Sequence, residues 1–171
     1  MGVRIFGDRV LKQRAEPVIE FDDSLRELTE AMKETMLESD GIGLAAPQVG
    51  VLKRLFIMGV PHNMKEREGA REWYVVINPV FLEKSDTDVV MEEGCLSFPG
   101  LYFEVGRPDA VSIKYQDEYG NEKTLDAEGV LARVIQHEYD HLDGTLFIDR
   151  ISAFKRSLLR NKLKKLQEEN Q

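Results

Sequence analysis

Residues 136–144 read QHEYDHLDG and contain an H-E-x-x-H pattern formed by His137, Glu138 and His141. The apolar residues that precede this pattern recur at helical spacing, and a glycine follows its end. We therefore predict a helix over residues 126–142 that carries both histidines. A helix with two histidines one turn apart is a frequent support for a metal ion, with the glutamate beside them as a base.

A helical wheel places the polar residues of this pattern among aliphatic side chains. With His137 at zero and about 100° per residue, His141 falls near 40° and Glu138 near 100°. Val130 and Val134 share this arc, which indicates a buried face. An ionised carboxylate buried alone costs several kcal/mol, and a metal with its bound water gives partners to all three groups. We therefore favour a metal site over two core histidines bonded to backbone carbonyls and a glutamate that reaches solvent. The remaining arc holds Ala132, Arg133, Gln136, Tyr139 and Asp140.

A catalytic metal usually has three protein ligands, so the two histidines need a third. Downstream, Asp143 is too near in the chain to close the site easily, and the final glutamates lie in a polar tail. Upstream, Cys95 lies in MEEGCLSFPG, where glycines and a proline end a predicted strand. A lone cysteine is commonly a small buried hydrophobe. Beside an H-E-x-x-H helix, however, its thiolate completes a three-ligand site with one open position. The third histidine, His62, is expected to be a solvated loop residue.

Composition limits the class of protein. Hydrophobic residues make up 42% and charged residues 32%, which is typical of a globular chain. The formal net charge is −8, so we do not expect DNA or other nucleic acid to bind broadly through a basic surface. No apolar run approaches the ~18 residues of a membrane span, and the opening residues lack a signal-peptide stretch, so we expect no membrane partner. A single cysteine forms no intrachain disulfide and favours a reducing compartment.

The other predicted elements indicate an α+β fold. Residues 21–37 are predicted to form a helix capped by Asp22 or Asp23, and residues 40–50 irregular or turning backbone. A charged loop at residues 61–72 separates the first two strands. We expect one domain over residues 1–171, with a mostly antiparallel or mixed sheet around the central H-E-x-x-H helix and flanking helices at both ends. Strands are predicted at 53–60, 72–82 and 86–93, a hairpin at 110–116 and 122–125, and a C-terminal helix at 153–169.

Three motifs resemble those of the peptide deformylase family: GIGLAAPQ at 41–48, EGCLS at 93–97 and HEYDH at 137–141. They stand in the family's order. The opening VRIFGDRVLKQRAEPV is also similar to the family's, with Gly7 where a proline often precedes the aspartate. The resemblance covers the chain nearly from end to end.

This resemblance implies a metal-dependent hydrolase. Cys95, His137 and His141 would hold a divalent metal with water or hydroxide as the fourth ligand. Metal binding lowers the pKa of that water and creates a nucleophile for the formyl carbonyl of an N-formylmethionyl peptide. Glu138 would take the proton of the water and deliver it to the leaving amine.

The resemblance also implies an oxyanion site. The side-chain amide of Gln48 and the backbone N–H of Leu96 would stabilise the charge that develops on the formyl oxygen. Without the flanking motifs, Gln48 would be interpreted as a loop-stabilising amide and Leu96 as a core leucine.

Substrate binding is implied along residues 41–44, where the peptide would add as an extended strand. Its methionine side chain would enter an apolar pocket, although each proposed pocket residue could equally belong to the core. Tyr102 stands where some bacterial members carry arginine, so the chain departs from the family pattern at the outer wall of the pocket. Arg107 is expected to pair with Glu93 or to lie on the surface. The expected substrate-binding residues are Gly41, Ile42, Gly43, Met91, Val130 and Val134.

Two expectations concern the metal and the partners. Softness and geometry favour Zn²⁺ for one thiolate and two imidazoles, whereas the resemblance implies Fe²⁺, with Zn²⁺, Ni²⁺ or Co²⁺ able to substitute; we follow the resemblance.

Residues 154–165, FKRSLLRNKLKK, contain six basic residues. They are interpreted either as a solvated helix face or, as in some family members, as a docking site for the ribosome. We expect a cytoplasmic protein.

Two other functions compete with deformylation. A zinc endopeptidase would use the same helix, cut unformylated internal peptide bonds and be indifferent to Cys95→Ser. A non-catalytic structural-metal or peptide-binding module would have four protein ligands and no use for Glu138.

Overall fold

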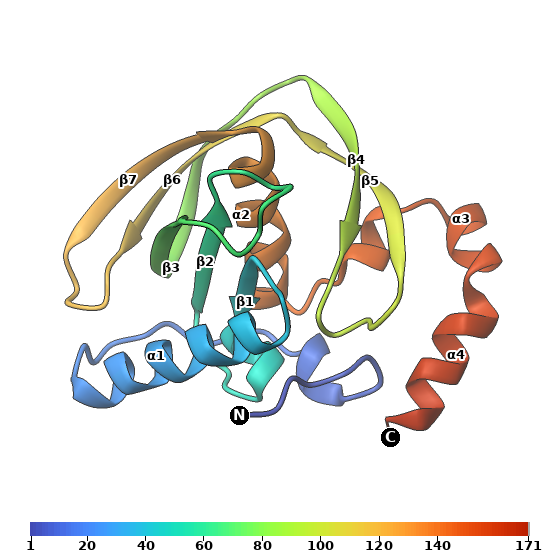
Figure 1. Cartoon of the computed structure of the whole chain (residues 1–171), viewed down its shortest axis with the longest axis horizontal. Coiled ribbons are helices and arrows are strands. Elements are labelled where there is room, and N and C mark those ends of the chain that lie inside the picture. The colour runs from blue at the N-terminus through green and yellow to red at the C-terminus, as the bar shows by residue number, and fades with distance from the viewer. Residues whose placement is uncertain (171) are drawn as a thin grey trace.

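The computed structural model of the chain describes residues 1–170, which contain four α-helices, three short 3₁₀ helices and seven strands (Figure 1). The helices are α1 (Asp23–Glu38), α2 (Gly129–Leu142), α3 (Ala153–Leu158) and α4 (Arg160–Glu169). The 3₁₀ helices are η1 (Arg9–Lys12), η2 (Ala46–Val49) and η3 (Phe147–Arg150). The strands are β1 (Gly43–Ala45), β2 (Leu55–Pro61), β3 (Arg71–Lys84), β4 (Asp88–Gly94), β5 (Tyr102–Pro108), β6 (Ala110–Gln116) and β7 (Glu122–Glu128).

The strands form two antiparallel sheets. The larger sheet has the order β1-β2-β3-β6-β7, and the smaller one pairs β4 with β5. Among residues 1–170, strand β1 pairs with β2 alone, so its other edge has no strand partner there. Within the described residues a single isolated bridge, between Glu16 and Lys53, is parallel. The predicted α+β class is confirmed, with antiparallel pairing throughout the named strands.

Helix α2 lies between the two sheets (Figure 1). Its apolar side contributes Ala132, Ile135 and Leu142 to a core cluster with residues of β2, β3, β6 and β7. The wheel left Arg133 and Asp140 outside the buried arc, but the structure buries both. The small β4–β5 sheet provides a partner for each of them, which no wheel of a single helix can reveal. The predicted central helix is therefore confirmed and is buried on two sides.

Helix α1 packs against β1 and β2 of the larger sheet, and the chain continues from α1 into β1. It begins after Asp22, whose carboxylate accepts a hydrogen bond of 3.0 Å from the Leu25 N–H, so one of the two predicted caps is confirmed. After α1 the backbone turns through Asp40 at φ 53°. The Gly41 N–H then donates to the Met36 carbonyl at 2.9 Å. This connection places the GIGLAAPQ motif at the sheet edge.

The predicted start of the central helix is wrong. Residues 126–128 belong to β7, where Asp126 pairs with Ser112 and Glu128 with Ala110 of β6. Gly129, at φ 61°, turns the chain from this strand into α2. Pairing across the hairpin therefore overrides the helical period at these three residues, and a left-handed glycine sets the boundary.

Two strands were missing from the sequence prediction. β1 lies inside the region predicted as irregular, and at three residues it is too short to show a period. β5 buries alternate residues, namely Phe103, Val105 and Arg107. An arginine at an inward position hid this alternation, because arginine is normally read as an outward residue.

The C-terminal helix forms, but it is interrupted at Leu159 between α3 and α4. Leu163 of α4 is buried in a cluster with Phe6, Phe98 and Phe147. Phe154 and Leu158 of α3, in contrast, are 72% and 69% exposed. Only the α4 part of this helical region therefore packs on the domain.

None of the helices in residues 1–170 is both long enough and apolar enough to cross a bilayer.

Candidate metal centre and active site

Helix α2 presents the two histidines of the H-E-x-x-H pattern on one side. The rings of His137 and His141 are one turn apart, with centroids separated by 5.2 Å. Both side chains are buried. Burial lowers the pKa of His141 well below its usual value, and this favours the neutral imidazole that binds metals.

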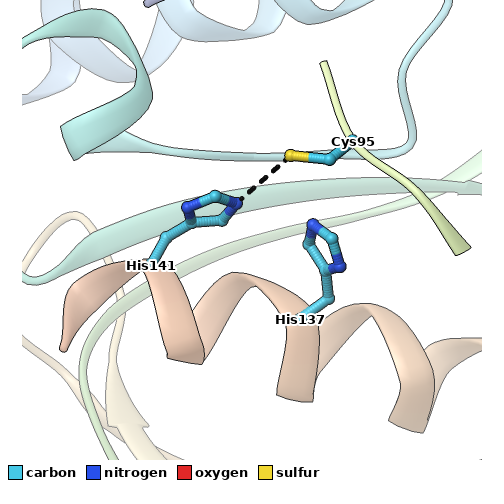
Figure 2. A group of neighbouring side chains, drawn as sticks. All are labelled: Cys95, His137 and His141. Atoms are coloured by element: carbon cyan, nitrogen blue, oxygen red, sulfur yellow. Dashed lines mark hydrogen bonds between the residues drawn. The ribbon is translucent and has the colours of Figure 1, made fainter. Parts of the chain in front are cut away.

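Cys95 approaches these histidines from the end of β4. The strand ends at Gly94, where an added Cβ would lie 2.5 Å from the ring of Tyr102 across the hairpin, so any larger residue would displace this ring. The chain then turns, and the Phe98 N–H donates to the Cys95 carbonyl at 2.9 Å. Figure 2 shows the sulfur above α2, with its Sγ 3.5 Å from Nε2 of His141.

The three side chains form a group that fits a metal ion. One ligand atom from each of Cys95, His137 and His141 lies within 4.8 Å of the others. Tetrahedral bonds of ~2.3 Å to sulfur and ~2.1 Å to nitrogen place two such ligands roughly 3.6 Å apart, close to the 3.5 Å between Sγ and Nε2 of His141. The sequence-predicted ligands are therefore brought together, and the donor set suits a divalent transition metal.

Glu93 orients His137 from behind. Its Oε1 lies 2.8 Å from Nδ1 of His137, so Nε2 of that ring remains for the metal-binding group. Arg107 donates to both carboxylate oxygens at 2.6 and 3.1 Å, and Arg133 donates to Oε2 at 2.8 Å. Burial alone would raise the pKa of Glu93, but the hydrogen bonds from His137 and Arg107 outweigh it and lower the pKa to about 2. The predicted pairing of Arg107 with Glu93 is confirmed.

Asp140 extends this network from the next turn of α2. Its Oδ2 accepts from Arg107 at 2.9 Å, and Arg150 binds both of its oxygens at 3.1 and 2.7 Å. Arg107 is thus held between a carboxylate of β4 and a carboxylate of α2. Arg133 also donates to the carbonyls of Val105 and Val89. The network joins α2 to both strands of the smaller sheet.

Glu138 lies on the side of α2 that faces β1. It is buried, and its Oε2 has no hydrogen-bond partner among the described residues. Burial raises the pKa of Glu138 to about 7 in the metal-free chain. A Cβ on Gly43 would lie 2.8 Å from Oε1 of Glu138, so this glycine allows β1 to approach the carboxylate. The arrangement places a carboxylate whose Oε2 has no partner among the described residues next to Gly43 of β1.

Gln48 reaches the metal-binding group from η2. Its Oε1 accepts a hydrogen bond of 2.9 Å from the Ala45 N–H, which fixes the orientation of the amide. Its Nε2 then donates to Oγ of Ser97 at 3.1 Å and lies 3.5 Å from Sγ of Cys95. The two motifs GIGLAAPQ and EGCLS therefore meet at this amide.

The expected oxyanion and substrate residues come from β4 and the turn after it, from the segment that leads into β1, and from α2. Leu96, next to Cys95, packs its side chain against a core cluster that joins Met36 of α1 to Leu44 of β1. A Cβ on Gly41 would lie 2.9 Å from Cδ1 of this leucine. Met91 is half-buried on β4, and Val134 is buried on α2. Ile42 and Val130 are partly buried and pack against the same core cluster as Val134.

The remaining candidates have ordinary structural partners. Tyr102 is 66% exposed and covers Gly94. His62 is exposed, as predicted. Asp143 pairs with Arg54 at 3.0 Å, outside the metal-binding group.

Several residues that support the site were not predicted from the sequence. Arg133 and Arg150 carry no metal-ligand chemistry, Asp140 binds arginines and lies outside the metal-binding group, and Ser97 is an ordinary turn residue by type. Their only sequence signal was position: Arg133 and Asp140 lie on the helix that carries the histidines, and Ser97 lies two residues after Cys95. Recognising them requires knowing that β4–β5 covers that side of α2.

Comparison with known proteins gives a consistent result for nearly the whole chain. Residues 1–157 match the family model described as polypeptide deformylase. A peptide deformylase of Thermotoga sp. (strain RQ2) is 49% identical over 161 residues, covering 94% of this chain and 93% of that protein. A peptide deformylase of Rickettsia akari is 46% identical over 162 residues, covering 93% of this chain and 91% of its own.

Solved structures agree in fold as well as in sequence. The structure of peptide deformylase from Thermus thermophilus matches with a TM-score of 0.88 and 45% identity, covering 98% of this chain and 97% of that one. A peptide deformylase structure from Plasmodium falciparum matches with a TM-score of 0.89 and 38% identity, over 98% of this chain and 96% of that one. The resemblance inferred from the three motifs is thereby confirmed, and the chain belongs to the peptide deformylase family.

Proposed function

We propose that this chain removes the formyl group from N-formylmethionyl peptides by metal-dependent hydrolysis, the known function of its family. One observation carries the proposal: the buried carboxylate of Glu138, with an unpartnered oxygen, stands beside a Cys-His-His group. A purely structural metal site would have no use for this carboxylate. Three ligands also leave one coordination position open, unlike a closed structural site.

Cys95, His137 and His141 would hold the metal. When bound, a divalent cation supplies a Lewis acid that lowers the pKa of its water towards neutrality. Glu93 supports this set because it fixes the ring of His137 through Nδ1.

Glu138 would act as the general base and then as the general acid. It takes a proton from the attacking water as the new carbon–oxygen bond forms at the formyl carbon. It then delivers that proton to the amine nitrogen as the carbon–nitrogen bond breaks. The products are formate and a peptide with a free amino terminus.

Gln48 and Leu96 would stabilise the oxygen of the formyl group. The amide nitrogen of Gln48 already lies beside Sγ of Cys95, and its carbonyl end is held by the Ala45 N–H. The Leu96 N–H follows the ligand cysteine directly in the chain. Losing one donor of this kind typically reduces turnover by about 10²–10³-fold.

The peptide would bind at the free edge of β1. Residues 41–44 offer backbone groups that accept many sequences, because pairing with a strand does not depend on side chains. The position of Glu138 against Gly43 supports this placement, since it puts the proposed base beside that edge. The methionine side chain would contact a pocket formed by Ile42, Met91, Val130 and Val134, with Gly41 and Gly43 at its rim.

The native metal is proposed to be Fe²⁺, with Zn²⁺, Ni²⁺ or Co²⁺ able to replace it. Family membership supports iron, and the mixed thiolate and imidazole set accepts several divalent metals. A thiolate beside Fe²⁺ predicts sensitivity to oxygen. Metal analysis of protein purified without oxygen decides the identity: stoichiometric zinc with full activity would overturn the assignment to iron.

The cytoplasm and the ribosome are proposed as the setting, because the substrate is a nascent chain. Lys155, Arg160, Lys162 and Lys164 are exposed on α3 and α4 and would contact ribosomal RNA. Deleting these helices would also remove Leu163 from the core, so replacing the four basic residues with glutamine is the cleaner change. The variant should co-sediment with ribosomes less well than the wild type, with a weaker dependence on salt. Unchanged binding would end the ribosome proposal.

The test of the proposed function is formate release from formyl-Met-Ala-Ser. Turnover by Glu138→Ala should fall by about 10²–10⁴-fold, while the metal content stays at the wild-type level. Glu34→Ala, an exposed change on α1, serves as the matched control and should be fully active. Full activity of Glu138→Ala would contradict the assigned role, and cleavage of unformylated casein would favour an endopeptidase.

A further inference from the structure

Arg71, the first residue of β3, joins three segments of backbone. Its Nη1 donates to the carbonyls of Gly41 at 2.8 Å and Gly59 at 2.9 Å. Its Nη2 donates to the carbonyl of Arg67 at 3.0 Å. Gly41 leads into β1, Gly59 lies on β2, and Arg67 lies in the charged loop at residues 62–70. One side chain thus ties this loop to the beginning of the proposed substrate-binding segment.

The segment that Arg71 holds has little regular structure of its own. Strand pairing of β1 begins only at Gly43, opposite Met58. Before it, the Gly59 N–H donates to the Ile42 carbonyl at 2.9 Å, and the Gly41 N–H donates to the Met36 carbonyl near the end of α1. The bond from Arg71 to the Gly41 carbonyl extends the order of the sheet edge beyond β1.

The metal-binding group sets the direction in which a peptide would run. Gln48 touches both Sγ of Cys95 and the N–H of Ala45, so the metal-binding group lies near the C-terminal end of β1. A peptide with its formyl end there would run along the edge towards Gly41. An extended chain rises ~3.3 Å per residue, which brings its second to fourth residues level with Gly41 and the loop at 62–70.

We propose that Arg71 is a positioning residue that lets the enzyme use the peptide residues that follow the methionine. This inference rests on the proposed function, because it requires a substrate paired with β1. Arg71 holds the Gly41 carbonyl and the loop in place before the peptide arrives. Binding of the later peptide residues then does not pay the entropy cost of ordering this edge. The affinity for a longer peptide is therefore higher than it would be with a flexible edge. A lysine lacks the planar fork that serves three carbonyls.

The experiment compares a short and a long substrate, formyl-Met amide and formyl-Met-Ala-Ser amide. The measured quantity is the ratio of kcat/KM for the long substrate to that for the short one. Arg71→Met should reduce this ratio about fivefold to tenfold, mainly through KM of the long substrate. Turnover of formyl-Met amide should change by less than about twofold, because no residue of that substrate follows the methionine along this edge.

Lys65→Met is the matched control. It removes one positive charge from the loop at residues 62–70, and its exposed side chain makes none of the three bonds that Arg71 makes. The ratio of kcat/KM for the long substrate to that for the short one should therefore stay at the wild-type value. Arg71→Lys keeps the positive charge but lacks the planar guanidinium group. It should reduce the kcat/KM ratio almost as much as Arg71→Met does. If Arg71→Met fails to fold, the measurement is made on Arg71→Lys alone.

The outcomes are distinct. Equal losses for both substrates, or a wild-type ratio in Arg71→Met or in Arg71→Lys, would overturn the positioning role and leave deformylation intact. A wild-type enzyme that releases no formate from either substrate would instead contradict the proposed function.

Discussion

The two sides of α2 are both buried, but they are built from different interactions. Towards the five-stranded sheet, Ala132 and Ile135 make apolar contacts in a core cluster. Towards β4–β5, Arg133 and Asp140 enter an ionic network with Arg107 and Glu93. A substitution on the apolar side should lower the free energy of unfolding in proportion to the number of buried atoms removed. A substitution that leaves one buried charge of the ionic network unpaired should lower it much more.

The difference separates stability from positioning. Glu93 of the charged side bonds to a candidate metal ligand, His137, and the same strand ends one residue before Cys95. The charged side therefore fixes the geometry of the metal-binding group, whereas the apolar side holds the helix in the domain. Substitutions on the two sides should differ both in the free energy of unfolding and in metal binding.

The largest effect is expected from Glu93→Gln. This change leaves Arg107 and Arg133 buried without their full countercharge, so the free energy of unfolding should fall by about 3–5 kcal/mol. Metal affinity should fall about 10–100-fold, because His137 loses its orienting partner. Denaturation of the metal-free protein separates the first effect from the second. Glu92→Gln, on the exposed side of the same strand, is the control and should be neutral.

Metal removal should have the next largest effect. A ligand at a hundred times its Kd stabilises the folded state by about 2.7 kcal/mol. A chelator should therefore lower the Tm of the metal-loaded wild type. Cys95→Ser should show little further loss when the chelator is added, since its site is already weakened. An identical chelator response in both proteins would show that the metal binds elsewhere.

A smaller effect is expected from Ile135→Val on the apolar side. Removing one buried methylene group should cost about 0.5–1.5 kcal/mol in denaturant unfolding. Metal content should not change, because this residue does not contact the network. A loss of metal in this variant would show that the two sides of α2 are not separable.

The smallest effect is expected from Arg150→Met, at the rim of the network. The side chain of Arg150 is 48% exposed, so solvent screens its pairing with Asp140. The free energy of unfolding should fall by less than about 1 kcal/mol, and Arg107 should keep Asp140 paired. If the free energy of unfolding fell as much as in Glu93→Gln, solvent would not screen the pairing of Arg150 with Asp140.

Sequence patterns predicted the parts of the site whose chemistry is local. The spacing of His137 and His141 follows from one helix, and Cys95 stands in a recognisable turn. The α+β class followed from strands with clear apolar character between two helical regions. The family resemblance added Gln48, which no periodicity would have singled out.

The remaining features depend on contacts between distant segments. The burial of Arg133 and Asp140 appears only once β4–β5 is placed against α2. The end of β7 at Glu128 is set by pairing with β6, which overrides the helical pattern there. The role proposed for Arg71 likewise needs three carbonyls from separate segments to meet at one side chain.

The central claim is that one sulfur and two imidazole nitrogens hold a single cation. X-ray absorption spectroscopy of the protein loaded with Zn²⁺ tests it most directly. We predict one sulfur at ~2.3 Å and two imidazole nitrogens at ~2.0–2.1 Å, with one further light atom from solvent. A coordination shell without sulfur would contradict this claim.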